Sequence, residues 1–548
     1  MRSKVILFLI IVIGFTLRLY KLDARPAGFT WDEAALGYNA YSLLKTARDE
    51  HGALAPVIFK SFGDYKPGLY VYFTVPSVAI FGLSEFSTRL PSAIFGTLLI
   101  LLIYALSRQL LLTSPLRLPS PKLGEGRVRY EENSPLAAAL LLAISPWAVH
   151  FSRGAWEANL ALLLTTLASV LYLRRSFTLA VLFFGLTFWS YQGAKLFTPL
   201  ILTSLFMVFK PKIGLKQIFY SLLLLLLTLT PILLGFSSQS GRLKVFNVFS
   251  YTRSQDSISG ILRQDKTDTP NWIYYLWHSE SLDQFRGIVE RYLNHLSPRF
   301  LFVDGDWSNS RHSTPYQGYL YYPEILILVM GICLLIKKFD SSSKFILFWL
   351  LLAPLPSAFS RDIVSGVRSL PMIIPLVVIS GIGLAKLSKN IAYLFLFSCA
   401  LLIFLVYYLD LFYVHSPHYS ADSWLYPYKP ALQLVKNNLP DFNRVIITNT
   451  LGQPYIFTLF YYRIDPTVFQ QKSTFVANQS GDVGEVTNFD KFYFQKVDWP
   501  ARRGDTSTLI VGNQYELPDQ DMNPPNLVRL GEIYLPNGIH ALRVVGLK

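Results

Sequence analysis

Residues 4–33 read KVILFLIIVIGFTLRLYKLDARPAGFTWDE, an apolar run that ends close to an acidic pair. A helix that crosses a bilayer needs about 20 mostly apolar residues, which the run over 4–20 nearly supplies. The run lacks the small residues of a signal cleavage site and continues into Tyr20. We therefore predict a retained membrane anchor, after which the chain carries Asp32 and Glu33 into the polar surroundings just outside the membrane.

The composition of the whole chain points to the same class of protein. Of its 548 residues, 52% are hydrophobic and 16% are charged, whereas soluble domains carry about 25% charged residues. These values argue against a disordered chain, a collagen, a coiled coil or a disulfide-rich secreted domain. The net charge of +15 favours a membrane over nucleic acid as the partner, because positive charge gathers in cytoplasmic loops. Cys333 and Cys399 lie in apolar runs, which predicts buried thiols and neither a disulfide nor a metal site.

Further apolar segments predict a polytopic α-helical membrane protein with about 11 transmembrane helices. The candidate spans are 4–20, 89–113, 135–150, 157–173, 177–190, 195–209, 216–236, 320–336, 344–359, 370–386 and 391–413.

The segment over 68–83, GLYVYFTVPSVAIFGL, is ambiguous because it holds only 16 residues and contains Pro76. If it does not span and the N-terminus is cytoplasmic, every short internal loop is basic, as the positive-inside rule requires. If it spans, all of these loops move outside. We therefore predict a helix at the outer surface over 68–83, a cytoplasmic N-terminus and an extracytoplasmic C-terminus. The basic residues concerned are Arg117, Lys122, Arg127, Arg129, Arg174, Arg175, Lys210, Lys212, Lys216, Lys337, Lys338, Lys344, Lys386 and Lys389.

Three regions then lie outside the membrane: the first loop 21–88, a larger loop 237–319 and the tail 414–548. The tail holds equal numbers of basic and acidic residues, which is typical of a soluble domain. We predict a transmembrane domain over 1–413 and an extracytoplasmic α/β domain over 414–548. The expected strands of the tail are 445–449, 507–511 and 541–545, and the expected helices are 453–463 and 486–497.

The first loop contains the most informative polar residues. Thr30 and Glu33 fit a capping box at the start of an amphipathic helix, and this alternative explains Glu33 better than Asp32. The functional alternative makes Asp32 or Glu33 a general base that takes a proton from an acceptor hydroxyl, in a semi-apolar site that raises its pKa.

Lys66 follows in the stretch FGDYKPGLY over 62–70, where we expect it to open the helix at the outer surface. A cation beside the free N–H groups of a helix N-terminus suits a phosphate. The alternative is a lysine whose apolar stem lies in the interface while its charge reaches water.

Other ionisable or polar side chains lie at the outer ends of predicted spans, where the positive-inside rule does not favour basic residues. An anionic lipid phosphate is one explanation; an interface anchor, or an Arg–Glu pair that fixes a turn, is the other. The residues are Arg153, Glu157, Tyr191, Lys195 and Arg368.

Asp304 and Asp306 flank a glycine near the end of the second loop. Their spacing could hold a divalent metal, although Asp-Gly is also a common turn dipeptide. His312 follows and is counted among the candidate substrate-binding residues. The chain has no convincing nucleotide-binding motif, so an enzyme acting outside would need an activated donor carried by the membrane.

In its motifs the chain resembles the family 39/83-type membrane glycosyltransferases of the GT-C superfamily, which include protein O-mannosyltransferases and the lipid A aminoarabinose transferase. The resemblance covers spans, first loop and tail. It is carried by Trp31-Asp32-Glu33, Lys66-Pro67, Arg89-Leu-Pro-Ser92 and Ser152-Arg153. This family often has a second proline where the present chain has Gly68.

The resemblance implies the GT-C fold and an inverting transfer of a sugar from a polyprenyl-phosphate donor on the outer face of the cell membrane. It implies that Asp32 is the base, that Lys66 and Arg368 contact the lipid phosphate with Arg153 and Glu157 nearby, and that Arg89 belongs to the site. No obligatory metal or other cofactor is expected. Two other functions stay open: an oligosaccharide ligase or polymerase with a lipid pyrophosphate donor, and a transporter of lipid-linked sugars. The sugar and the acceptor are not specified.

Overall fold

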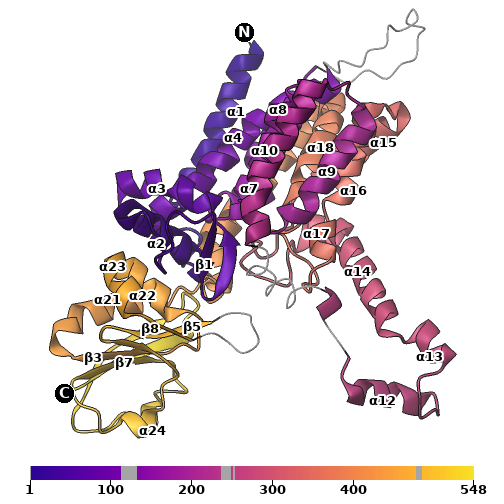
Figure 1. The fold of residues 1–548 in the computed structure, drawn as a ribbon. Helices are drawn as coiled ribbons and strands as arrows, with labels where there is room; N and C mark the ends of the chain where they lie inside the picture. Colours follow the sequence, from indigo (N-terminus) through magenta and orange to yellow (C-terminus); the bar gives the residue numbers. More distant parts are fainter. Residues whose placement is uncertain (1, 113–131, 236–247, 251–252, 477–483) are drawn as a thin grey trace, which may run out of the picture.

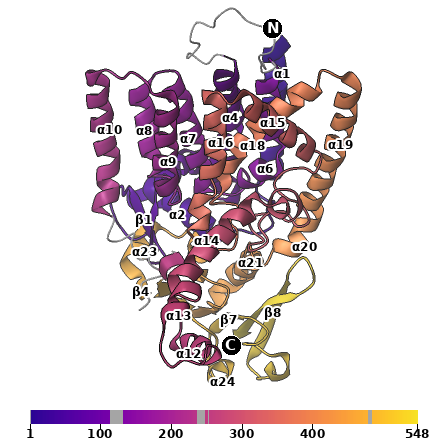
Figure 2. The ribbon, with the colours of Figure 1, turned by 90° about the vertical axis from the view of Figure 1, so that its right-hand side faces the viewer.

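The computed structural model describes residues 2–112, 132–235, 248–250, 253–476 and 484–548. A bundle of helices forms one part of the molecule and a C-terminal sheet the other (Figure 1). The N-terminus and the sheet lie at opposite ends of the bundle, here called the N-terminal end and the sheet end (Figure 2). The basic loop that includes Arg117 and Arg129 lies outside the described residues.

Each predicted span contains a helix of the bundle over the described residues. Four helical stretches are long and apolar enough to cross a membrane by themselves: Glu85–Leu111, Leu215–Leu234, Leu370–Leu387 and Ile391–Ser420. The helices of the bundle are α1 (Arg2–Leu19), α4 (Glu85–Leu111), α5 (Ser134–Ile144), α6 (Pro146–Phe151), α7 (Glu157–Leu173), α8 (Phe177–Thr187), α9 (Ala194–Phe209), α10 (Leu215–Leu234), α15 (Glu324–Lys338), α16 (Ser341–Leu352), α17 (Leu355–Ala358), α18 (Ile373–Leu387) and α19 (Ile391–Asp410).

The prediction of buried cysteine thiols is wrong. Cys333 on α15 and Cys399 on α19 are both exposed on the outside of the bundle. An apolar run in a membrane protein can face lipid as well as the core, so hydropathy alone does not indicate burial.

At the sheet end, the first loop forms helix α2 (Trp31–Thr46), a hairpin of β1 (Ile58–Ser61) and β2 (Asp64–Pro67), and helix α3 (Leu69–Phe81). Phe62 and Gly63 both have positive φ, of 57° and 77°, as the two central residues of a tight type I′ hairpin turn require. Lys66 therefore lies in β2, and the expectation that it opens a helix is wrong: α3 begins at Leu69.

The C-terminal sheet has seven strands in the order β4-β5-β6-β3-β7-β9-β8, in which β3 is parallel to β6 and β7 and the other pairs are antiparallel. The three predicted strands and the first predicted helix are present. The strands are β3 (Arg444–Ile447), β4 (Thr474–Val476), β5 (Glu485–Phe489), β6 (Phe492–Phe494), β7 (Thr508–Gly512), β8 (Leu527–Tyr534) and β9 (His540–Leu547), and the helices of this region include α21 (Tyr428–Asn438), α22 (Pro454–Tyr462), α23 (Pro466–Lys472) and α24 (Trp499–Arg502).

The predicted helix over 486–497 is wrong, because this segment holds β5 and β6. Asp490 adopts a left-handed φ of 48° and turns the chain between the two strands. Phe489, Phe492 and Phe494 are buried against α23 and α22. Burial in the sheet overrides the local preference of the segment.

Helix α22 joins the sheet to the first loop. A methyl group added to Gly37 of α2 would lie 2.4 Å from Thr88 Oγ1 on α4 and 2.7 Å from the Phe460 ring on α22. The small residue thus lets three helices approach closely. One hydrophobic core runs from the bundle through the first loop into the sheet.

The second loop forms an arm at the sheet end, made of α12 (Gln255–Gln264), α13 (Trp272–Trp277) and α14 (Glu280–Leu296) (Figure 1). The π-helical turn Arg299–Val303 follows it and returns the chain to the bundle.

Candidate active site

The start of α2 separates the two carboxylates of the acidic pair. Thr30 Oγ1 accepts a hydrogen bond from the Glu33 backbone N–H at 3.2 Å, and Glu33 Oε2 accepts one from the Thr30 N–H at 3.1 Å. This is the capping box that the sequence predicts. The Glu33 carboxylate is therefore bonded to the helix cap. The side chain of the preceding residue, Asp32, points toward the hairpin instead.

Glu33 is also the partner of a buried arginine. Arg89 on α4 donates from Nε to Glu33 Oε1 at 2.8 Å and from Nη2 to Glu33 Oε2 at 3.0 Å. Its other N–H groups donate to the carbonyl oxygens of Leu22, Pro26 and Gly28. Both side chains are almost fully buried. The pair therefore holds the first loop on α4, and neither charge faces an open pocket.

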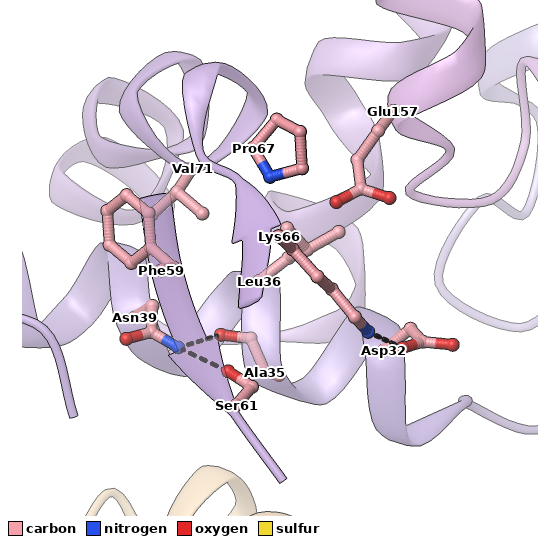
Figure 3. Close-up of a pocket in the computed structure, with 10 residues that line it drawn as sticks. All are labelled: Asp32, Ala35, Leu36, Asn39, Phe59, Ser61, Lys66, Pro67, Val71 and Glu157. Carbon is pink, nitrogen blue, oxygen red and sulfur yellow. Dashed lines mark hydrogen bonds and ion pairs between the residues drawn. The ribbon is translucent and has the colours of Figure 1, made fainter. Parts of the chain in front are cut away.

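Asp32 instead forms an ion pair with Lys66 Nζ across the gap between α2 and β2 (Figure 3). The Asp32 side chain is 39% exposed and the Lys66 side chain is 13% exposed. Lys66 also lies against the Phe62 ring, with Nζ 5.2 Å from the ring centroid. Asp32 is thus the more exposed of the two carboxylates in the acidic pair.

A small pocket surrounds the ion pair. Its volume is about 20 Å³, room for a single water molecule. Figure 3 shows the Glu157 carboxylate, from the first turn of α7, turned toward the pocket. The lining residues are Asp32, Ala35, Leu36, Asn39, Phe59, Ser61, Lys66, Pro67, Val71 and Glu157.

Asn39 fixes the hairpin on α2. Its Nδ2 donates to the Ala35 carbonyl oxygen at 3.0 Å and to Ser61 Oγ at 3.3 Å, and its Oδ1 accepts from the Glu50 N–H at 2.9 Å. These bonds hold β1, the first strand of the hairpin, on the helix that carries Asp32.

Behind the hairpin lies a second buried acid. Glu50 is fully buried, and burial raises its pKa from 4.5 to about 8. Burial likewise lowers the pKa of the neighbouring His51 to about 4. The Tyr455 hydroxyl of α22 donates to Glu50 Oε1 at 3.4 Å, so a titratable group lies where the first loop meets the C-terminal region.

Arg153 is bound by the protein itself. Its guanidinium donates to the carbonyl oxygens of Leu17, Tyr20, Lys21 and Arg25 and stacks on the rings of Phe412 and Tyr413. Arg153 therefore fastens the end of α1 at the sheet end of the bundle.

The loop that carries Tyr191 and leads into Lys195, in the first turn of α9, lies beside the hairpin. Gln192 Nε2 donates to the Tyr65 carbonyl oxygen at 3.2 Å, and the Leu69 N–H donates to the Trp189 carbonyl oxygen at 2.8 Å. The structure thus brings this loop next to the strand that holds Lys66.

Asp306 and His312 form a separate buried cluster. Asp306 Oδ2 bonds His312 Nδ1 at 2.7 Å and accepts from the Gly366 N–H at 2.8 Å. Burial alone would raise the pKa of Asp306, but these hydrogen bonds hold it below its ordinary value, while burial lowers the pKa of His312. Arg368, in the same loop as Gly366, pairs with Asp362.

The chain bends at Gly305, between the two aspartates. Asp304 pairs with Arg299 at 2.6 Å, and Gly305 between the two aspartates has a φ of +65°. Among the described residues, no group of three or more His, Cys, Asp or Glu side chains is placed to hold a metal ion.

A further cation, Arg311, lies beside the first residue of α2. The guanidinium of Arg311 lies 5.8 Å from the centroid of the Trp31 ring, next to Asp32 in the chain. His150 Nε2 lies 2.7 Å from the Arg311 carbonyl oxygen and, as the donor, holds the backbone of this loop. The only sequence signal for Arg311 was its position next to His312, since 280 residues separate it from Trp31.

The comparisons with known proteins match the chain by its fold. No protein-family model and no curated protein matches the sequence. The crystal structure of apo ArnT from Cupriavidus metallidurans superposes with a TM-score of 0.55 at 12% identity and covers 100% of this chain and 98% of ArnT. ArnT bound to undecaprenyl phosphate gives 0.52 at 12% identity, with 98% and 97% covered.

The archaeal oligosaccharyltransferase AglB from Archaeoglobus fulgidus has a TM-score of 0.45 at 13% identity, and the match covers 83% of this chain and 63% of AglB. This chain therefore spans less than two thirds of the length of AglB. The similarity to ArnT over both full lengths confirms the GT-C fold that the motifs predict, with apolar helices of a membrane protein.

Proposed function

We propose that this chain is a glycosyltransferase that takes a sugar from a polyprenyl-phosphate donor and transfers it to an acceptor on the outer face of the membrane. The observation that carries the proposal is the Asp32–Lys66 pair, a carboxylate and an ammonium that share one pocket at the sheet end. ArnT, whose fold this chain has, was solved with undecaprenyl phosphate bound.

In this proposal Asp32 is the general base. An inverting transfer needs a carboxylate that takes the proton of the acceptor hydroxyl while the sugar–phosphate bond breaks. Asp32 suits this role better than Glu33, because Glu33 is held by Arg89 and by two backbone N–H groups. We assign Glu33, Arg89 and Arg153 to positioning the loop that carries the base.

Lys66 stabilises the leaving phosphate in the proposed mechanism. While Lys66 is paired with Asp32, neither group can act, because the ammonium neutralises the base and the pocket is too small for a sugar. A donor phosphate would compete for Lys66 and thereby release the Asp32 carboxylate. Donor binding and activation of the base are coupled in this way.

Further groups around the pocket complete the proposed site. Glu157 faces it directly and Arg311 lies beside Trp31. Tyr191 and Lys195 stay candidates for contacts with the donor through the loop beside the hairpin. Arg368 and His312 stay candidates on the Asp306 side of the outer end. The acceptor, the sugar and a requirement for a divalent metal are not assigned.

The donor's polyprenyl chain would leave the site along α3. This helix buries Tyr70 and Val71 and exposes Phe73, Ile80 and Phe81, an apolar face suited to lipid. We propose that α3 lies at the outer surface of a domain of about 11 spans over 1–413, that the N-terminus is cytoplasmic, and that residues 414–548 form the extracytoplasmic domain.

The experiment compares binding with transfer in three variants of the full-length protein. Asp32→Asn should abolish transfer but bind undecaprenyl phosphate at least as tightly as wild type, because Lys66 loses its competitor. Lys66→Ala should weaken that binding, and Lys66→Arg should restore part of it. Asp304→Asn, which removes a carboxylate paired with an exposed arginine, is the matched control and should change neither.

Binding is measured on the purified protein in nanodiscs, and transfer by mass spectrometry of glycans, lipids and proteins from a deletion strain complemented with each variant. A donor that accumulates in the deletion strain as a monophosphate supports the proposal, whereas a pyrophosphate favours the ligase or polymerase. Full transfer by Asp32→Asn would refute the role of the base.

A further inference from the structure

A second, larger cavity is lined by residues near the ends of α4, α7 and α9 and the start of α16. Figure 2 shows the N-terminal end of the bundle, which lies opposite the sheet. The cavity has a volume of about 370 Å³. It opens between the end of α4, the turn from α7 to α8, the end of α9 and the start of α16. Its lining residues are Gln109, Leu110, Tyr172, Leu173, Arg175, Phe177, Phe209, Lys210, Pro211, Lys212 and Ser342.

The mouth of this cavity carries three cations. Arg175 follows the end of α7, and Lys210 and Lys212 follow the end of α9. The backbones of Arg175 and Lys210 are both left-handed, with φ of 64° and 38°. Each helix thus ends abruptly at a basic residue, and the two ends meet at one cavity. The carboxylate of Asp340 caps α16 and pairs with Lys338, so its charge is already used within the fold.

Part of the cavity wall is apolar, and this part includes a tyrosine hydroxyl. Tyr172 is 5% exposed, and its hydroxyl lacks a hydrogen-bond partner within the described residues. A buried hydroxyl without a partner is costly, so its position in the lining points to a ligand that supplies an acceptor. Phe177 and Phe209 provide the surrounding apolar surface.

We propose that this cavity binds a phosphate group carried by an anionic membrane lipid. The three cations and the Tyr172 hydroxyl would contact the phosphate oxygens, and the phenylalanines would contact the start of an acyl chain. A free phosphate has the same charge but gains nothing from the apolar wall. Basic pockets between membrane helices are suited to anionic headgroups of the cytoplasmic leaflet, which agrees with the orientation proposed above.

The test measures lipid retention by native mass spectrometry of the full-length protein, extracted from nanodiscs of phosphatidylcholine with or without phosphatidylglycerol. Lys210→Gln with Lys212→Gln should weaken phosphatidylglycerol binding about 30-fold, as expected for two charges of about 1 kcal/mol each. Tyr172→Phe removes only the hydroxyl and should also weaken it. Lys386→Gln with Lys389→Gln removes two charges from exposed positions at the same end, outside the lining, and is the matched control.

Loss of phosphatidylglycerol in the first two variants, but not in the control, supports the proposal. Equal loss in the control pair would overturn it, because the effect would then be general surface charge. Protection of the wild-type protein against thermal unfolding by inorganic phosphate alone, to the same extent as by the lipid, would assign the cavity to a soluble anion and would also overturn it. None of these readouts depends on sugar transfer.

Discussion

Replacing Glu50 with glutamine should remove a pH-dependent loss of stability where the first loop packs against the C-terminal region. Glu50 is fully buried below the hairpin and bonded by Tyr455 of α22. Burial raises its pKa from 4.5 to about 8. The folded protein therefore keeps this proton at neutral pH, whereas the unfolded chain has already lost it.

The sign and the size follow from this difference. Because the pKa is raised on folding, the stabilisation is complete below pH 4.5 and is lost as pH rises through about 8. Between about pH 6.5 and about pH 8.5, integration at about 1.4 kcal/mol per pH unit gives a loss of about 2 kcal/mol in the free energy of unfolding. His51, whose pKa is lowered to about 4, stays neutral in the folded protein over this range.

The assay is equilibrium unfolding of the purified full-length protein in mild detergent, followed by tryptophan fluorescence at the two pH values. Glu50→Gln has no carboxyl group to titrate at this position, so its free energy of unfolding should not show this loss. Relative to wild type, the variant should therefore be about 2 kcal/mol more stable at the higher pH than at the lower pH. Glu485→Gln removes the same charge from an exposed strand position and should follow wild type. A difference between Glu50→Gln and wild type that does not change with pH would refute the reasoning.

Three further predictions concern packing and the pocket. Arg89→Met leaves Glu33 buried without its cation and should cost about 3–5 kcal/mol; adding Glu33→Gln should recover part of this in the same unfolding assay. Gly37→Ala forces a methyl group to 2.4 Å from Thr88 Oγ1 and should cost about 1–3 kcal/mol, a loss that Thr88→Ala should reduce. Arg311→Gln should weaken binding of undecaprenyl phosphate in nanodiscs but leave the unfolding midpoint unchanged; unchanged binding would remove Arg311 from the proposed site.

Much of the fold could be predicted because its signals are local. Each apolar segment contains a helix, and the three β-branched and aliphatic runs of the tail form β3, β7 and β9. The failures lie where local signals compete with distant contacts. The segment 486–497 becomes a hairpin because its phenylalanines pack on α22 and α23, and Lys66 joins a strand because Phe62 and Gly63 make a tight turn.

The roles of the charged residues divide in the same way. The sequence alone identified the acidic pair, Lys66 and the basic residues of the outer ends as unusual for their depth, since hydropathy and charge bias are properties of the chain. Only the tertiary structure decided which carboxylate is buried and which is partly exposed. Glu33 is bonded in its helix cap and to Arg89, whereas Asp32 forms an ion pair with Lys66.

The same residue type can hold the protein together or face a ligand, and the choice depends on which backbone carbonyls and carboxylates lie within reach. Arg153 finds four carbonyl oxygens at the end of α1 and in the segment that follows it, so its charge is used inside the fold. Arg311 reaches Trp31 across the molecule instead. Residue patterns along the chain determine most of the helices and strands. Contacts between residues far apart in sequence determine which charged side chains are bonded within the fold and which line a pocket where they could contact a ligand.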